Sequence, residues 1–267
     1  AFLYHRLYFT LNARGASGPF GRWLLARWEA HPPDEDRMFD RMTVFGILYL
    51  LAFALVLSLI GYDLVMATDP HWYSTLFGAY TFVKAVYIGF GALIVLSAFL
   101  HLSSRNSYHV GENQFHDIGK LFFAFCLVWA DFFYAQFVVI WYGNIPEETA
   151  YIIERTMATP WNVLAWTVFV GCFLAPFLIL LNRRIKTIPR AMIVICLATM
   201  TGIWLEHYLL LGPSFHHHTD HIPLGWVEAA VAMGFFGLLA AAITGYFQQF
   251  PELLQGKKVE TIKVEAG

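Results

Sequence analysis

Six long apolar runs constrain the fold of this chain more than any other feature of its sequence. A helix needs about 20 apolar residues to cross a hydrocarbon core of roughly 30 Å, and each run is long enough. Prolines lie mainly between the runs or at their ends, and Pro176, inside the fourth run, is expected to kink its helix. We therefore predict an all-α, polytopic membrane helix bundle with about six transmembrane helices. The runs are Met42–Tyr62, Leu76–Leu100, Leu121–Tyr142, Trp161–Leu181, Ala191–Leu211 and Leu224–Phe247.

The composition supports a membrane protein. Apolar residues make up 58% of the chain and charged residues only 13%, which is far from the balance of a soluble domain. The formal net charge of -2 favours no nucleic-acid partner. All three cysteines fall inside apolar runs without a CxxC spacing, so we expect small core side chains and no iron–sulfur cluster held by this chain itself.

The charged and apolar segments predict three parts. Residues 1–41 are expected to be the end of an upstream helix followed by a cytoplasmic amphipathic connector, since tryptophans and leucines alternate there with arginines. Residues 42–247 form the six-helix transmembrane domain, and residues 248–267 form a cytoplasmic tail. The chain opens abruptly on a short apolar fragment without a Met, so we expect it to be the C-terminal part of a larger protein.

The distribution of Lys and Arg predicts the orientation of the bundle. Most of them lie before the first run, in the second and fourth turns, and in the tail. Turns rich in Lys and Arg remain on the cytoplasmic side, so both ends of this segment are predicted to be cytoplasmic. Four tryptophans then fall at the opposite edge, where an aromatic belt would lie; they are Trp72, Trp141, Trp161 and Trp226.

Several ionisable residues lie within the runs. Asp131 is near the middle of the third run, Lys84 lies in the second, and Glu206 and His207 lie in the fifth. Such residues are costly in a bilayer and often functional, so we expect Lys84 to face one of Asp131, Glu206 or Asp63 and to line a polar cavity or a proton route. The alternative is that they form interhelical ion pairs without any transport role.

The histidines offer weaker hypotheses. No run carries two histidines about a dozen residues apart, so a haem held within the bundle is not favoured. The cluster of His216, His217, His218 and His221 has imidazoles that could bind a divalent metal, or that could contact another subunit in a pH-dependent way.

Three segments carry a resemblance to a known family. They are Asp63–Gly78 (DLVMATDPHWYSTLFG), His116–Phe125 (HDIGKLFFAF) and Gln136–Thr149 (QFVVIWYGNIPEET). Together they resemble the NrfD/PsrC-like integral membrane subunits, and most closely the ActF-type subunit of alternative complex III, a bacterial quinol:electron-acceptor oxidoreductase. The similarity extends over about residues 37–247.

The resemblance implies a subunit of a respiratory or photosynthetic complex in the bacterial inner membrane. The chain would hold no cofactor; haem c and iron–sulfur clusters would belong to partner subunits, beside an NrfD-like sister subunit, and quinol would be the substrate of the complex. It would contribute a proton path and a docking surface for redox subunits on the outer face. The alternatives are a structural anchor without proton transfer, a quinone-binding subunit, or a free-standing transporter, which the absence of an evident internal repeat disfavours.

We expect ten residues to form the proton path. Four form the buried relay, three its outer exit and three its cytoplasmic entrance. In that order, they are Asp131, Lys84, Glu206 and His207; Asp63, Asp69 and His71; and His116, Asp117 and Lys120. Asp117 and Lys120 also fit an ordinary helix start, where Asp117 favours the positive end of the helix dipole and Lys120 extends to the headgroups.

Overall fold

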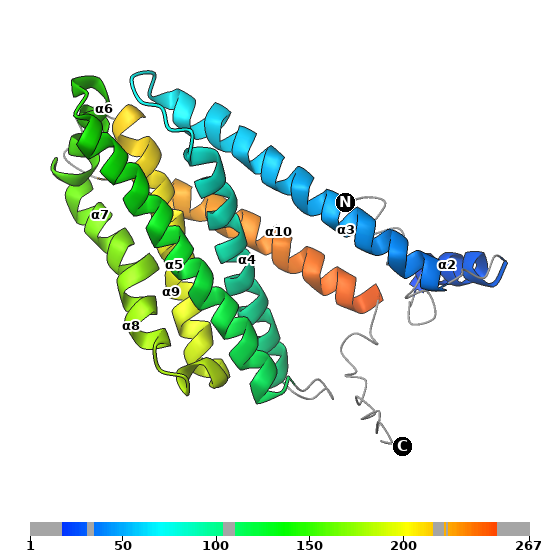
Figure 1. The fold of residues 1–267 in the computed structure, drawn as a ribbon. Coiled ribbons are helices and arrows are strands. Elements are labelled where there is room, and N and C mark those ends of the chain that lie inside the picture. The colour runs from blue at the N-terminus through cyan, green and yellow to red at the C-terminus, as the bar shows by residue number, and fades with distance from the viewer. Residues whose placement is uncertain (1–17, 31–34, 104–109, 216–221, 223, 250–267) are drawn as a thin grey trace, which may run out of the picture. The chain divides into compact units, whose positions relative to one another are not determined.

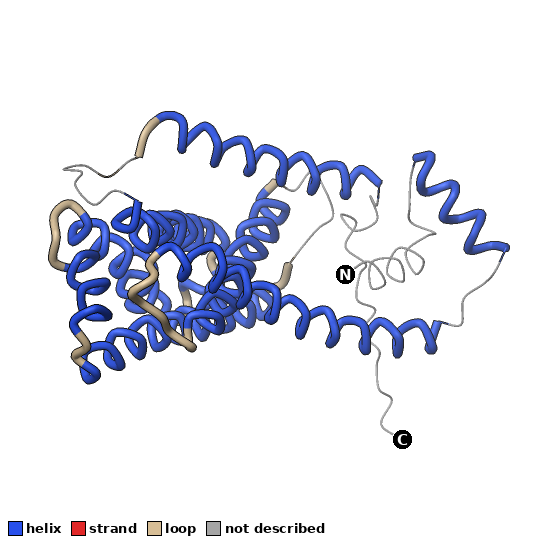
Figure 2. Tube along the Cα trace, turned by 90° about the horizontal axis from the view of Figure 1, so that it is seen from above, coloured by secondary structure: helices blue, strands red, loops and turns tan. Residues whose placement is uncertain are grey.

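The computed structural model describes residues 18–30, 35–103, 110–215, 222 and 224–249. Every regular element in these ranges is helical, as Figure 2 shows, which confirms the all-α prediction. The α-helices are α2 (Gly18–Ala30), α3 (Glu35–Ile60), α4 (Phe77–Leu102), α5 (Glu112–Gly143), α6 (Pro146–Thr156), α7 (Trp161–Phe169), α8 (Ala175–Leu180), α9 (Pro189–Phe215) and α10 (Trp226–Gln249). The predictions for residues 1–17 and for the histidine cluster at 216–221 lie outside the described ranges, as does nearly all of the predicted tail.

Six helical segments in the described ranges are long and apolar enough to cross a membrane, as the six runs predict. The largest difference from the prediction is in α5, which begins at Glu112 and therefore includes nine residues before the apolar run. Its polar first turns carry their own start signals, since Glu112 lies in the first turn and the Gln114 side chain accepts a hydrogen bond from the backbone of Gly111. The connector contains a short helix, α2, whose location in the membrane interface stays a prediction.

Two of the spanning helices contain a π-helix. One, Gly61–Val65, continues α3 and leads into the 3₁₀ helix Met66–Thr68. The other, Val170–Leu174, separates α7 from α8 and ends just before Pro176, where a kink is expected because proline removes a backbone donor and crowds the preceding turn. Pro213 departs from the prediction that it ends a run, because it lies inside the last turns of α9.

The chain forms two compact units, which we describe separately. One consists of residues 1–47, 103–109 and 227–267, and its described part includes α2, the beginning of α3 and nearly all of α10. The other, residues 48–102 and 110–226, contains α4 to α9 and the whole candidate site. In this second unit α4 packs against α5 and α9, α7 packs against α9, and α8 packs against α5. Successive spanning helices of this unit run in alternating directions (Figure 1).

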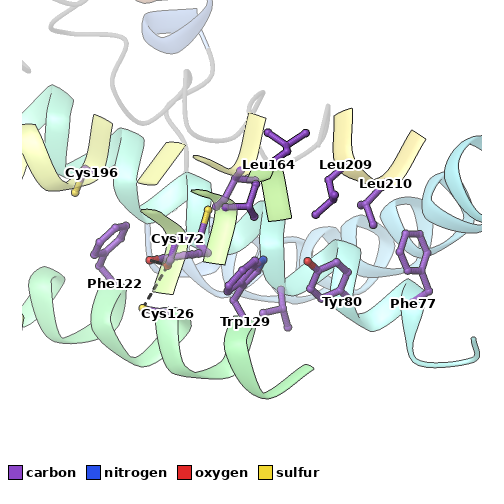
Figure 3. Packing of buried hydrophobic residues seen from close by; sticks show 14 of the residues in the cluster. Phe77, Tyr80, Phe122, Cys126, Trp129, Leu164, Cys172, Cys196, Leu209 and Leu210 are labelled. Carbon is purple, nitrogen blue, oxygen red and sulfur yellow. Dashed lines mark hydrogen bonds between the residues drawn. The ribbon is translucent and has the colours of Figure 1, made fainter. Parts of the chain in front are cut away.

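Aromatic and small side chains fill the core of the second unit. Tyr80 and Tyr87 from α4, Phe122 and Trp129 from α5, and Leu209 from α9 are all buried together. Figure 3 shows Tyr80 beside Trp129, and Cys126 from α5 directed at the backbone of Cys172. The three cysteines are buried and form no disulfide, as predicted for core side chains.

Close helix approach in this unit depends on glycine. A Cβ on Gly202 of α9 would lie 2.6 Å from Cys172 Sγ, and a Cβ on Gly212 would overlap the indole ring of Trp161. Both glycines therefore allow α9 to approach α7 and the π-helix Val170–Leu174 more closely than any larger residue would. The same packing buries Trp161 to 3% exposure, so this predicted member of the aromatic belt is a core residue, as is Trp72.

Helix α6 is an element that the sequence interpretation missed, because its residues lie between the third and fourth apolar runs. The start signals are nevertheless present, with Pro146 in the first positions and Glu147 and Glu148 in the first turn. Arg155 lies in the last turn, where a cation favours the negative end of the helix dipole. This short helix contributes Arg155 to a cluster of charged and polar groups where α6 meets the end of α9.

Candidate functional site: a buried ion pair and its two flanking clusters

A buried ion pair joins α4 to α9. Lys84 Nζ lies 3.4 Å from Glu206 Oε1, and the two residues are only 4% and 0% exposed. An isolated charge at such a place would cost roughly several kcal/mol of desolvation free energy. The opposite charge of the pair offsets this cost. Of the three carboxylates predicted as candidate partners for Lys84, the structure brings Glu206 to it.

Tyr80 completes this buried cluster. It lies one turn before Lys84 on the same face of α4, because residues four apart on a helix are neighbours. Its hydroxyl donates a hydrogen bond to Glu206 Oε1, and its ring centroid lies 5.1 Å from Lys84 Nζ. One carboxylate oxygen thus receives both the phenol and the ammonium. We call Tyr80, Lys84 and Glu206 the buried triad.

The second carboxylate oxygen of Glu206 differs from the first. Oε2 is buried and has no hydrogen-bond partner among the residues that the structure describes. Buried polar atoms are rarely left in this state, because the loss of hydration is then not compensated. Oε2 can therefore accept a proton without breaking an existing hydrogen bond, whereas Oε1 cannot.

His207 follows Glu206 in α9 and is half-buried. Its Nδ1 lies 2.8 Å from the backbone oxygen of Ile203, one turn earlier in the same helix. This contact orients the ring along α9, since a neutral imidazole with a proton on Nδ1 donates to such an oxygen. In this tautomer the other ring nitrogen, Nε2, carries the lone pair of the imidazole.

A second cluster lies where α6 meets the end of α9, and Arg155 is its centre. The guanidinium donates from Nε and Nη2 to the backbone oxygen of Leu210, at 3.3 and 2.9 Å, and from Nη2 to Ser214 Oγ at 2.8 Å. Nη1 donates to the backbone oxygen of Tyr151 at 3.0 Å and lies 3.7 Å from Asp69 Oδ2. Arg155 thus ties α6, the end of α9 and the loop before α4 together.

Aromatic stacking supports the same arginine. The guanidinium carbon lies 3.4 Å from the Tyr151 ring centroid, and Trp72 stacks on Tyr151 with the ring centroids 3.9 Å apart. Burial lowers the pKa of Arg155 from its ordinary value and raises the pKa of Tyr151. Because an arginine pKa starts above 12, Arg155 remains charged at neutral pH and acts as a fixed cation that holds Asp69.

Replacing Arg155 with Lys tests whether this geometry, and not charge alone, holds α6, the end of α9 and the loop before α4 together. Lysine keeps the charge but cannot form the fork of hydrogen bonds to Leu210 and Ser214, so we expect a loss of about 2 kcal/mol in the free energy of unfolding. Unfolding of the purified protein in neutral detergent measures it. Arg184→Lys, at an exposed position, is the matched control. Equal stability of the two variants would contradict this role.

A cavity of about 80 Å³ separates the buried triad from the Arg155 cluster. Tyr80 lines it on the side of the triad, and Trp72, Tyr151 and Thr156 line it on the other, together with apolar side chains of α5 such as Phe133. The cavity is lined mainly by apolar groups, and each cluster contributes one tyrosine to it, Tyr80 and Tyr151.

The other predicted residues fall into three groups. Asp131 is exposed on the surface of α5 and does not join the triad, and Asp63 and His71 are also exposed. Asp69 is half-buried beside Arg155.

The predicted entrance residues lie together at the start of α5, where Asp117 Oδ1 is 2.9 Å from Lys120 Nζ and 3.8 Å from His116 Nδ1.

Two buried residues of the site were missed by the sequence interpretation, namely Tyr80 and Arg155. Tyr80 could have been found by its spacing of four from Lys84. Arg155 lies between two apolar runs in the sequence, and only the packing of α6 against α9 buries it.

No metal site is evident in the described part of the chain, where no three His, Cys, Asp or Glu side chains are grouped to hold an ion. The fold and this site define a multi-pass helical membrane protein with a buried carboxyl group that is paired with a lysine. Comparison of the chain with known protein families and with curated proteins gave no match.

Proposed function

We propose that this chain is a membrane subunit of a quinol:electron-acceptor oxidoreductase complex of the alternative complex III type, and that its buried triad transfers protons. The resemblance of three segments to ActF-type subunits supports the complex. The single observation that carries the proton role is the environment of Glu206, a fully buried carboxyl with one oxygen held by Lys84 and Tyr80 and the other free to accept a proton.

Quinol oxidation releases two electrons and two protons, and the two kinds of particle need separate routes. The electrons would pass to haem c and iron–sulfur clusters in partner subunits, next to an NrfD-like sister subunit. The protons would use Glu206, because its Oε2 has no hydrogen-bond partner among the described residues and could take a proton while Oε1 keeps its contacts with Lys84 and Tyr80. His207 and the Tyr80 hydroxyl would exchange protons with it.

The two flanking clusters supply the ends of the proposed route. Asp69, held by Arg155, would serve as the outer exit across the cavity, and His116 with Asp117 and Lys120 would serve as the entrance on the cytoplasmic side. Asp131, Asp63 and His71 would take part only through contacts with a partner subunit, since their side chains are exposed in this chain. The complex would reside in the bacterial inner membrane with both ends of this segment in the cytoplasm.

A structural anchor for redox subunits is the second candidate. The Arg155 cluster favours it, because a rigid outer end with exposed Trp141, Tyr142 and Tyr73 nearby in sequence is suited to docking. This function requires no proton on Glu206.

Glu206→Gln separates the two functions. Glutamine keeps the size and the contact with Tyr80 but cannot ionise, so proton transfer through the site should slow on the order of 100-fold and fewer protons should be released per electron. Proton release per electron is measured with the purified complex in vesicles supplied with quinol. Glu147→Gln, an exposed carboxylate of α6, is the control. If Glu206→Gln oxidises quinol with an unchanged proton-to-electron ratio, the triad is structural and the anchor function stands.

A further inference from the structure

Basic side chains gather where α5 begins and the turn after α8 leads into α9. His116 and Lys120 come from α5, and Arg183 and Lys186 come from that turn, whose 3₁₀ helix Ile185–Thr187 packs on α5 (Figure 1). Lys120, Arg183 and Lys186 all lie close enough to His116 to interact with it electrostatically. Lys120 also interacts electrostatically with Lys186. We call these four residues the basic cluster.

Lys186 is an unusual member of this cluster, because it is only 8% exposed. Its side-chain carbons pack on Gly119, where a Cβ would lie 3.1 Å from Lys186 Cβ, and its Nζ lies 4.7 Å from the Phe123 ring centroid. Burial, and secondarily Lys120, lowers the pKa of Lys186. The packing thus holds an ammonium group in a cationic site, at a cost that a bound anion would offset.

The carboxylates of this region do not neutralise the cluster. Asp117 pairs with Lys120 and lies near His116, and among the described residues no carboxylate forms an ion pair with Lys186 or Arg183. Three lysine and arginine side chains therefore face one carboxylate. The surrounding surface is apolar, since Leu121 is 46% exposed, Leu181 59% and Ile188 46%.

We propose that the basic cluster binds the phosphate group of an anionic phospholipid. Lys120 and Arg183 would contact the phosphate oxygens, because ammonium and guanidinium groups are the usual partners of phosphate in proteins. Lys186 would add positive charge from its buried position behind these two side chains. The acyl chains would lie on the exposed apolar side chains of α5 and of the turn. The location also fits, because the site lies at the ends of spanning helices that the Lys and Arg distribution assigns to the cytoplasmic leaflet.

A thermal unfolding titration tests this inference. The purified protein in neutral detergent is titrated with phosphatidylglycerol, with phosphatidylcholine and with inorganic phosphate. Phosphatidylglycerol should raise the unfolding midpoint in a saturable way, because a ligand bound only to the folded state stabilises it. Phosphatidylcholine and inorganic phosphate should leave the midpoint unchanged at equal concentration. An equal shift with inorganic phosphate would identify a soluble anion site, and an equal shift with phosphatidylcholine would identify non-specific solvation; both overturn the proposal.

Variants at exposed positions then assign the effect to this cluster. Lys120→Gln with Arg183→Gln removes two exposed charges and should weaken phosphatidylglycerol binding roughly 30-fold. Arg190→Gln, exposed at the start of α9, is the control and should bind as the unaltered protein does. Asp117→Asn should strengthen binding, because it removes the opposing carboxylate. Unaltered affinity in the double variant would overturn the assignment. The basic cluster shares His116 and Lys120 with the proposed proton entrance, but lipid binding is tested by the unfolding midpoint and the proton role by proton release, so each can fail without the other.

Discussion

Replacing Lys84 with Met should destabilise the protein by about 3 to 5 kcal/mol, because it leaves the carboxylate of Glu206 fully buried beside an apolar side chain. Methionine has a similar length and flexibility, so the loss of packing contributes little. The free energy of unfolding in mixed detergent micelles measures this change.

The double variant Lys84→Met, Glu206→Leu provides the decisive comparison. A buried ion pair that is replaced as a whole by apolar residues usually costs little, so most of the stability should return. Lys120→Met is the control on the same protein, because the exposed pair of Lys120 with Asp117 is worth at most about 1 kcal/mol. A single variant as stable as the unaltered protein, or a double variant as unstable as the single one, would show that the pair does not compensate a buried charge.

Gly212→Ala is expected to have the second large effect, a loss of about 3 kcal/mol in the free energy of unfolding. The added methyl group would overlap the indole ring of Trp161, which is 3% exposed and cannot move without disturbing the start of α7. Overpacking of this kind forces side chains away from their preferred rotamers or separates helices. Thermal and detergent unfolding of the purified variant both report it.

Gly89→Ala in α4 is the matched control for this substitution. Nothing lies within 4 Å of a Cβ at this position, so alanine should raise stability by roughly 0.5 to 1 kcal/mol through its better helix propensity. Combining Gly212→Ala with Trp161→Phe should recover part of the lost stability, since the smaller ring leaves room for the methyl group. Equal stability of the two glycine variants would show that α9 and α7 are not in close contact at Gly212.

The helices themselves were predictable because their signals are local. Each apolar run is long enough to cross a bilayer, and Pro176 marks the π-helix that separates α7 from α8. The start of α5 at Glu112 and the existence of α6 also have local signals, in Gln114 and in Pro146 with Glu147. The first turns of α5 were missed because its apolar run was treated as the whole helix, and α6 was missed because it contains no long apolar run.

The side on which each charge lies could not be predicted. A spanning helix is apolar on every face, so the sequence has no polar stripe that indicates which face meets a neighbour. Helix α5 buries Phe115, Phe122, Cys126 and Trp129 and leaves Asp131 outside, although the composition around its circumference is similar. Which of Glu206, Asp131 and Asp63 faces Lys84 therefore depends on how the helices are rotated about their own axes. The sequence does not give this rotation.

The sequence by itself thus determined the number of spanning helices, their approximate ends and the presence of Lys84 and Glu206 in apolar surroundings, because length and hydropathy act within one segment. Only the tertiary structure decided that Tyr80 joins this pair, that Arg155 is buried by α6, and that Lys186 lies among other cations beside Phe123. The physical reason is that contacts between residues more than 50 positions apart depend on helix packing, which the glycines and aromatic rings of facing helices set jointly.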